Sequence, residues 1–153
     1  MSTLENQAIP AMEKLLQSEP DQLFLELGLR RKAVESDPMQ AGLFQITATY
    51  DADFAGPLDA LRDFGQEFFT RVSKDVFNLV CGEDSENSEQ RKKLLEAFGG
   101  GKTTFAAALA ALCVSWFGWA PAIAAVVAAL VVKLFLNNAY IAMCEVWKKN
   151  LPA

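Results

Sequence analysis

The chain has 153 residues, of which 52% are apolar and 22% are charged, and its formal net charge is −5. This length supports one domain with a hydrophobic core. Because the chain contains no histidine, it holds no Ser-His-Asp or Cys-His arrangement and no HExxH zinc site. The acidic balance argues against nucleic-acid binding, which depends on clustered Lys and Arg that neutralise phosphates.

Charge and apolarity divide the chain into two parts. Residues 1–102 contain 11 Lys/Arg and 18 Asp/Glu, whereas residues 103–153 contain three Lys, one Glu and 38 apolar residues. No charged residue lies between Lys102 and Lys133. We expect an acidic region of amphipathic helices over 1–102, followed over 103–153 by an apolar helical hairpin with an amphipathic end, the two forming one structural unit.

The first 30 residues indicate two short helices, the second with Pro20 in its first turn and Gly28 near its end. The run LFLELGL in the second helix also alternates, which leaves a strand as the alternative there. Residues 43–50 (LFQITATY) give the clearest strand pattern in the chain, because every second residue from Phe44 onward is apolar. The predicted fold is therefore mainly α, with a short strand near 43–50.

The longest helix of the first part is predicted over residues 57–80, with Pro57 in its first turn. Gly65 lies inside this helix and costs it about 1 kcal/mol relative to Ala, so we expect tight packing to offset that cost. Gly99–Gly101 then end a further helix that carries RKKLLEAF. The expected apolar stripe of the long helix consists of Leu58, Leu61, Phe64, Phe68, Val72 and Val76.

The segment GGGKTT (99–104) matches the end of a P-loop pattern but not its beginning. Glu96 occupies the position where the pattern requires its first Gly, and a helix rather than a strand is predicted before it. We interpret the segment as a turn between two helices, with Thr103 or Thr104 capping the second. No nucleotide cofactor is expected.

Two acidic patterns are also weak as functional sites. In DADFAGPLDALR (51–62), Ala55 and Arg62 occupy two ligand positions of a calcium loop, so no calcium binding is expected. Asp59, Asp63 and Glu67 share one helical face, but no second polar cluster is evident, and we interpret them as a solvated surface. The sequence therefore predicts no catalytic residue, no cofactor and no metal site.

The three cysteines, Cys81, Cys113 and Cys144, adjoin or lie within apolar runs, and their number is odd. We expect buried reduced thiols rather than disulfides. The first 30 residues contain five acidic side chains, which does not fit the basic start of a secretory signal. These features favour a cytoplasmic N-terminal region.

The apolar part predicts a hairpin of two helices. Gly118 and Pro121 interrupt the apolar run, since proline lacks an amide donor and fits a first helical turn. One helix is expected near 103–117 and the other from 121 onward. The first helix, of about 15 residues, falls short of the roughly 20 that a membrane span needs, whereas one continuous kinked helix over 104–132 would be long enough.

The second hairpin helix is expected to change character after Val132. Lys133, Asn137, Tyr140, Cys144 and Lys148 recur at helical spacing and would form a polar stripe. Such an amphipathic end suits an aqueous surface, a bilayer interface or a partner helix. For Lys133 the simplest interpretation is an exposed or snorkelling side chain.

The turn of the predicted hairpin is aromatic. Trp116, Phe117 and Trp119 lie where a water-exposed turn would normally carry polar residues. Aromatic clusters of this kind suit the bilayer interface, and they equally suit a turn sheathed by other helices. The second arrangement is similar in architecture to pore-forming domains, which hold an apolar hairpin within a shell of amphipathic helices, although no motif is shared. The expected sheath consists of Phe64, Phe68, Phe69, Val72, Val76 and Phe77.

These observations favour a non-enzymatic, membrane-associated helical protein whose apolar hairpin inserts into or anchors at a bilayer, as pore-forming or effector proteins do. Basic residues on both flanks would keep the hairpin ends on the cytoplasmic side. The alternative is a soluble, all-α interaction or adaptor module whose apolar third is its core or an oligomer interface. The expected partner is a lipid bilayer or a protein, including a second copy of the chain, and not a nucleic acid. The expected contact residues are Trp116, Phe117, Trp119, Lys133, Asn137 and Tyr140.

Overall fold

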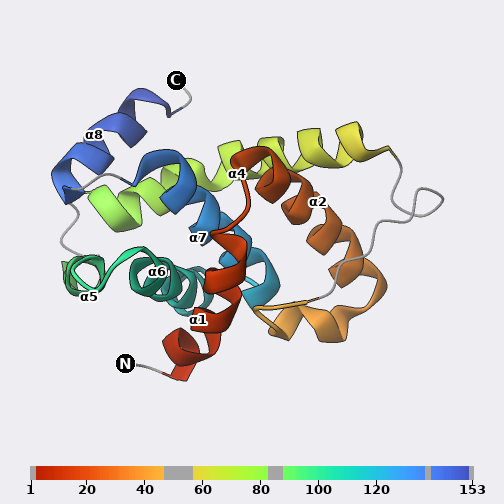
Figure 1. Cartoon of the computed structure of the whole chain (residues 1–153), viewed down its shortest axis with the longest axis horizontal. Helices are drawn as coiled ribbons and strands as arrows, with labels where there is room; N and C mark the ends of the chain where they lie inside the picture. The colour runs from red at the N-terminus through yellow and green to blue at the C-terminus, as the bar shows by residue number, and fades with distance from the viewer. Residues whose placement is uncertain (1–2, 47–56, 83–87, 137–138, 152–153) are drawn as a thin grey trace.

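The computed structural model describes residues 3–46, 57–82, 88–136 and 139–151. Throughout this part of the chain the regular structure is helical, which confirms the mainly α fold (Figure 1). Of the strand predicted near 43–50, residues 43–46 are irregular, and the rest lies outside the described residues. The elements are α1 (Thr3–Leu15), α2 (Pro20–Ser36), the short 3-10 helix η1 (Pro38–Gly42), α4 (Leu58–Cys81), α5 (Ser88–Phe98), α6 (Lys102–Phe117), α7 (Pro121–Phe135) and α8 (Tyr140–Lys149).

The predicted apolar hairpin is confirmed as α6 and α7. Gly118 ends α6 in the left-handed conformation, at φ 73°, which glycine adopts without steric cost. Its N–H donates to the carbonyl oxygen of Val114, and Pro121 begins α7 in the first-turn position that suits its fixed φ. At the other end of α6, Gly101 precedes the helix at φ 103°, so neither Thr103 nor Thr104 is the cap.

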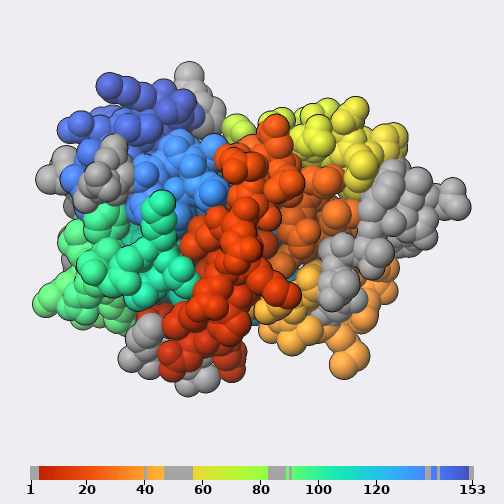
Figure 2. Space-filling model, viewed as in Figure 1, coloured from red at the N-terminus to blue at the C-terminus, as the bar shows by residue number. Residues whose placement is uncertain are grey.

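The hairpin is the core of the molecule. Every residue from 105 to 113 and from 122 to 132 is buried. Helix α1 packs on both hairpin helices, α5 packs beside α6, and α2 packs on α7. Figure 2 shows α1 lying across this face of the molecule, between the green surface of α5 and α6 and the light-orange surface of η1. A central pair of Ala- and Val-rich helices therefore has amphipathic helices around it.

The sheath differs from the one expected. Helix α4 packs mainly on α2 rather than along the hairpin, and Phe69 reaches α7 only near its end, where its ring stacks on Phe135 with the centroids 6.5 Å apart. The buried face of α4 is also displaced from the predicted stripe, because Leu58 is exposed and Phe64, Phe68 and Val72 are half-buried. The buried residues of α4 are Leu61, Gly65, Phe69, Ser73, Val76, Leu79 and Val80.

Two glycines explain this displacement. Gly28 lies in the interior of α2, not near its end, and a Cβ there would collide with the carbonyl oxygen of Leu61. A Cβ at Gly65 would likewise collide with the carbonyl oxygen of Phe24. Helices α2 and α4 therefore cross with their backbones in contact, which is the packing expected to offset the cost of Gly65.

The predicted continuous helix from 121 to the C-terminal end is wrong. Helix α7 ends at Phe135, and α8 is a separate helix that folds back. The break allows Trp147 to become fully buried, where its ring stacks on Phe135 at 5.2 Å and its Nε1–H donates to Ser73 Oγ at 2.9 Å. A straight continuation would leave this large side chain without that packing.

Candidate functional site

The hairpin tip, defined here as Trp116, Phe117 and Trp119, is where the apolar core reaches the surface. Trp116 lies in the last turn of α6 with 44% of its surface exposed. Phe117 and Trp119 are half-buried, and their rings stack with centroids 5.0 Å apart across the turn at Gly118. Two of the three predicted tip residues thus cover each other, and the third faces outward.

The other end of the hairpin, its base, carries different exposed groups. Lys133 is exposed beside Leu134, which is 37% exposed. Between the tip and the base, residues 105–113 and 122–132 are buried. The aromatic residues of the tip are therefore separated from the exposed residues of the base.

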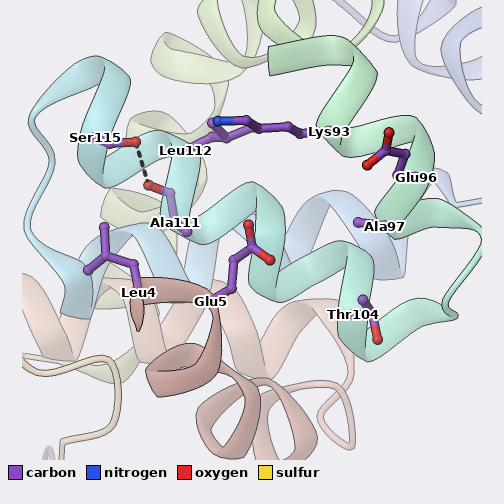
Figure 3. Close-up of a pocket in the computed structure, with 9 residues that line it drawn as sticks. All are labelled: Leu4, Glu5, Lys93, Glu96, Ala97, Thr104, Ala111, Leu112 and Ser115. Atoms are coloured by element: carbon purple, nitrogen blue, oxygen red, sulfur yellow. Dashed lines mark hydrogen bonds between the residues drawn. The ribbon is translucent and has the colours of Figure 1, made fainter. Parts of the chain in front are cut away.

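A cleft exposes part of α6 between α1 and α5 (Figure 3). Its volume is about 560 Å³, and its floor includes Ala111 and Leu112. Figure 3 shows Glu5 pointing from α1 toward α6, while the side chain of Lys93 extends from α5 over Leu112. An apolar floor with charges of both signs at its rim carries no evident catalytic arrangement.

Arg30 holds the start of α7 close to the tip. It is 2% exposed, and its Nε donates to Glu26 at 2.8 Å. Its Nη1 donates to the carbonyl oxygens of Phe44, at 2.7 Å, and of Ala122, at 2.9 Å. The sequence gives no signal for this residue beyond the helical spacing from Glu26, because both carbonyl acceptors are distant in the chain.

The predicted polar stripe does not form. Asn137 lies outside the described residues, and the break before α8 separates Lys133 from Tyr140. Tyr140 is half-buried, and its hydroxyl donates to the carbonyl oxygen of Val80 at the end of α4. Burial raises the pKa of this hydroxyl above its usual range. Tyr140 and Lys133 therefore do not join the tip in one site.

The expected set of three reduced thiols is also wrong. Cys81 at the end of α4 forms a disulfide with Cys144 on α8, with the Cα atoms 5.7 Å apart. The thiol of Cys113 is free and buried within α6, and burial raises its pKa. An odd number of cysteines shows only that they cannot all be paired within the chain. The sequence did not predict that α8 folds back and brings Cys144 to Cys81.

The other motifs take structural positions. GGGKTT joins α5 to α6, so a helix and not a strand precedes it. Asp59, Asp63 and Glu67 are exposed on α4, and residues 51–56 of the calcium-loop pattern lie outside the described residues. Within the described ranges, no group of three His, Cys, Asp or Glu residues is placed to hold a metal ion.

None of the described helices combines the length and the apolarity needed to cross a membrane. The chain matches no protein-family model, no curated protein and no solved structure.

Proposed function

We propose that this is a non-enzymatic, membrane-associated helical protein that anchors at a bilayer through its hairpin tip. The observation that carries the proposal is Trp116, an indole 44% exposed at the turn of a hairpin whose residues 105–113 and 122–132 are buried. Tryptophan favours the bilayer interface, because its ring is apolar and its N–H can still reach water or headgroups.

The dimensions of the hairpin favour shallow anchoring. Helices α6 and α7 contain 16 and 15 residues, so each is roughly 22–24 Å long at 1.5 Å per residue. The hydrocarbon core of a bilayer is about 30 Å thick. A tip that enters the interfacial region while the helices stay sheathed needs no unfolding. Deeper insertion of the hairpin, as in the pore-forming architecture, would require α1 and α5 to separate from α6.

The side of the membrane stays a prediction. Arg91, Lys92, Lys93 and Lys102 precede the hairpin and Lys148 and Lys149 follow it, a bias that favours a cytoplasmic location for both ends. The disulfide between Cys81 and Cys144 favours an oxidising compartment instead. Labelling with a membrane-impermeant amine reagent in intact and permeabilised cells distinguishes the two locations.

A second candidate function is an interaction module, in which the apolar third serves only as core. The complete burial of residues 105–113 and 122–132 favours this function. Apolar residues that form a core stabilise the fold, and they need no membrane role to explain their presence. In that case the exposed face of Trp116 would contact a protein partner or a second copy of the chain.

The two candidates are separated by one matched pair of variants. Trp116→Ser removes the exposed apolar residue at the tip, and Leu134→Ser removes one at the base, on the same hairpin and with similar exposure. We expect the native chain and Leu134→Ser to co-sediment with vesicles of phosphatidylcholine and phosphatidylglycerol, and Trp116→Ser to do so much less. Absence of vesicle binding by the native chain, or equal binding by both variants, would contradict the proposal.

A further inference from the structure

A second surface feature lies away from the tip, among the end of α4, α5 and α8 (Figure 1, left side). These elements enclose an open groove of about 810 Å³, a volume within the range of small-molecule sites. Apolar walls come from Phe77, from Leu95, which is 49% exposed, and from the disulfide between Cys81 and Cys144. The groove could therefore cover an apolar chain of a ligand.

Arg91 on α5 is one of the charged residues that line this groove. Its Nε and Nη2 atoms are buried, and neither has a hydrogen-bond partner. Arg91 lines the groove together with Tyr140 and Lys148 of α8. Arg91 as a whole is half-buried, but these two nitrogens lose hydration that nothing in the described structure replaces.

Other arginines with a buried, unpaired Nε have compensating contacts. Arg62 forms an ion pair with Asp59 through Nη1 at 3.3 Å. Arg31 places its guanidinium over the ring of Phe68, 5.2 Å from the centroid. Arg91 has neither kind of contact among the described residues, so it is the arginine that most requires an external anion.

We propose that this groove binds a single-chain amphiphile with a carboxylate head, such as a long-chain fatty acid. The carboxylate would pair with the positive charge of Arg91, which lines the groove. Lys148 adds a second positive charge at the rim, opposed by the single carboxylate of Glu145 on the same helix. The alkyl chain would lie along Phe77, Leu95 and the disulfide.

Acidic side chains of the chain itself would compete with a ligand for Arg91. Glu83, Asp84 and Glu86 precede α5 in the sequence and lie outside the described residues. If these carboxylates satisfied Arg91 in solution, a fatty acid would not bind, and the experiment below would then overturn the proposal.

The test is calorimetric titration of the full chain with myristate below its micelle concentration, without vesicles. We expect saturable binding at one site per chain, weakened at least about tenfold (about 1.4 kcal/mol) by Arg91→Met, which removes the positive charge that the carboxylate pairs with. The matched control is Lys92→Met, which removes the same charge from the exposed neighbouring position on α5 and should bind as the native chain does. Acetate, which has no tail, and tetradecanol, which has no charge, should each bind much more weakly than myristate.

Two further variants keep the test decisive. Leu95→Asp places a carboxylate on the exposed wall of the groove and should weaken myristate binding even if Arg91→Met fails to fold. Trp116→Ser should bind myristate normally, because the groove does not include the tip, so this inference and the proposed function fail separately. Absence of saturable binding to the native chain, or equal affinities for the native chain and a folded Arg91→Met variant, would overturn the proposal.

Discussion

Arg30 on α2 donates a hydrogen bond to the carbonyl oxygen of Ala122, 92 positions later, in the first turn of α7. The same nitrogen donates to the carbonyl oxygen of Phe44, and Nε pairs with Glu26. One buried guanidinium thus joins the sheath, the segment after η1 and the start of the second hairpin helix. It fixes the part of the hairpin that leads into the tip.

Replacing this guanidinium should therefore weaken the whole fold. Arg30→Met leaves two carbonyl oxygens and the partly buried carboxylate of Glu26 without their donor, and we expect a loss of about 2–4 kcal/mol in the free energy of unfolding. Urea denaturation followed by circular dichroism measures it. Arg62→Met, which breaks an exposed pair with Asp59, should change stability by less than about 1 kcal/mol. Equal effects of the two variants would contradict the role assigned to Arg30.

The close crossing of α2 and α4 predicts the effect of a methyl group. Gly65→Ala should destabilise the chain by more than about 2 kcal/mol, although alanine favours helices, because its Cβ would meet the backbone of Phe24. Gly42→Ala is the control, since a Cβ at that position meets nothing within 4 Å. A stabilised Gly65→Ala variant in urea denaturation would show that the two helices do not pack in this way.

The disulfide determines how many cysteine thiols can react with an alkylating reagent before and after reduction. When the unreduced chain is denatured and treated with iodoacetamide, mass spectrometry should find one modified thiol, that of Cys113, and three after reduction. Closing a chain separation of 63 residues should contribute about 4 kcal/mol to stability in the loop-entropy account. Three modified thiols without reduction would restore the sequence-based expectation of reduced cysteines.

The buried thiol of Cys113 and the half-buried hydroxyl of Tyr140 should make the chain less stable at alkaline pH. Burial raises the pKa values of the Cys113 thiol and the Tyr140 hydroxyl in the folded chain. Above the unfolded-state pKa values, near 8.5 for Cys and 10 for Tyr, the unfolded chain loses these protons while the folded chain retains them, so the unfolding free energy falls as pH rises. Urea denaturation at pH 7 and pH 10.5 measures the fall, which Cys113→Ala should reduce. An unchanged pH dependence in that variant would contradict the assignment to Cys113.

The hairpin could be predicted from sequence because its signals are local. The apolar run, Gly118 and Pro121 specify two helices and a turn without reference to the rest of the chain. The end of α7, the pairing of Cys81 with Cys144 and the contacts of Arg30 depend on which distant surfaces meet. Burial of Trp147 against Ser73 and Phe135 outweighs the local preference for a continuous helix, and no pattern within α7 and α8 indicates that outcome. The same local signals place the aromatic residues at the turn, whereas the groove beside Arg91 could not be predicted, because its walls come from three separated helices.

The account depends most on the tip meeting the bilayer while the rest of the hairpin stays covered. The direct measurement is quenching of tryptophan fluorescence by vesicles made with brominated phospholipids. Trp116 and Trp119 should be quenched in the native chain, whereas Trp147, a fully buried residue of α8, should not. A Trp116→Phe/Trp119→Phe variant, which keeps the tip apolar, should still bind vesicles and should lose the quenching. No quenching in the native chain, or quenching that persists in this variant through Trp147, would contradict the account.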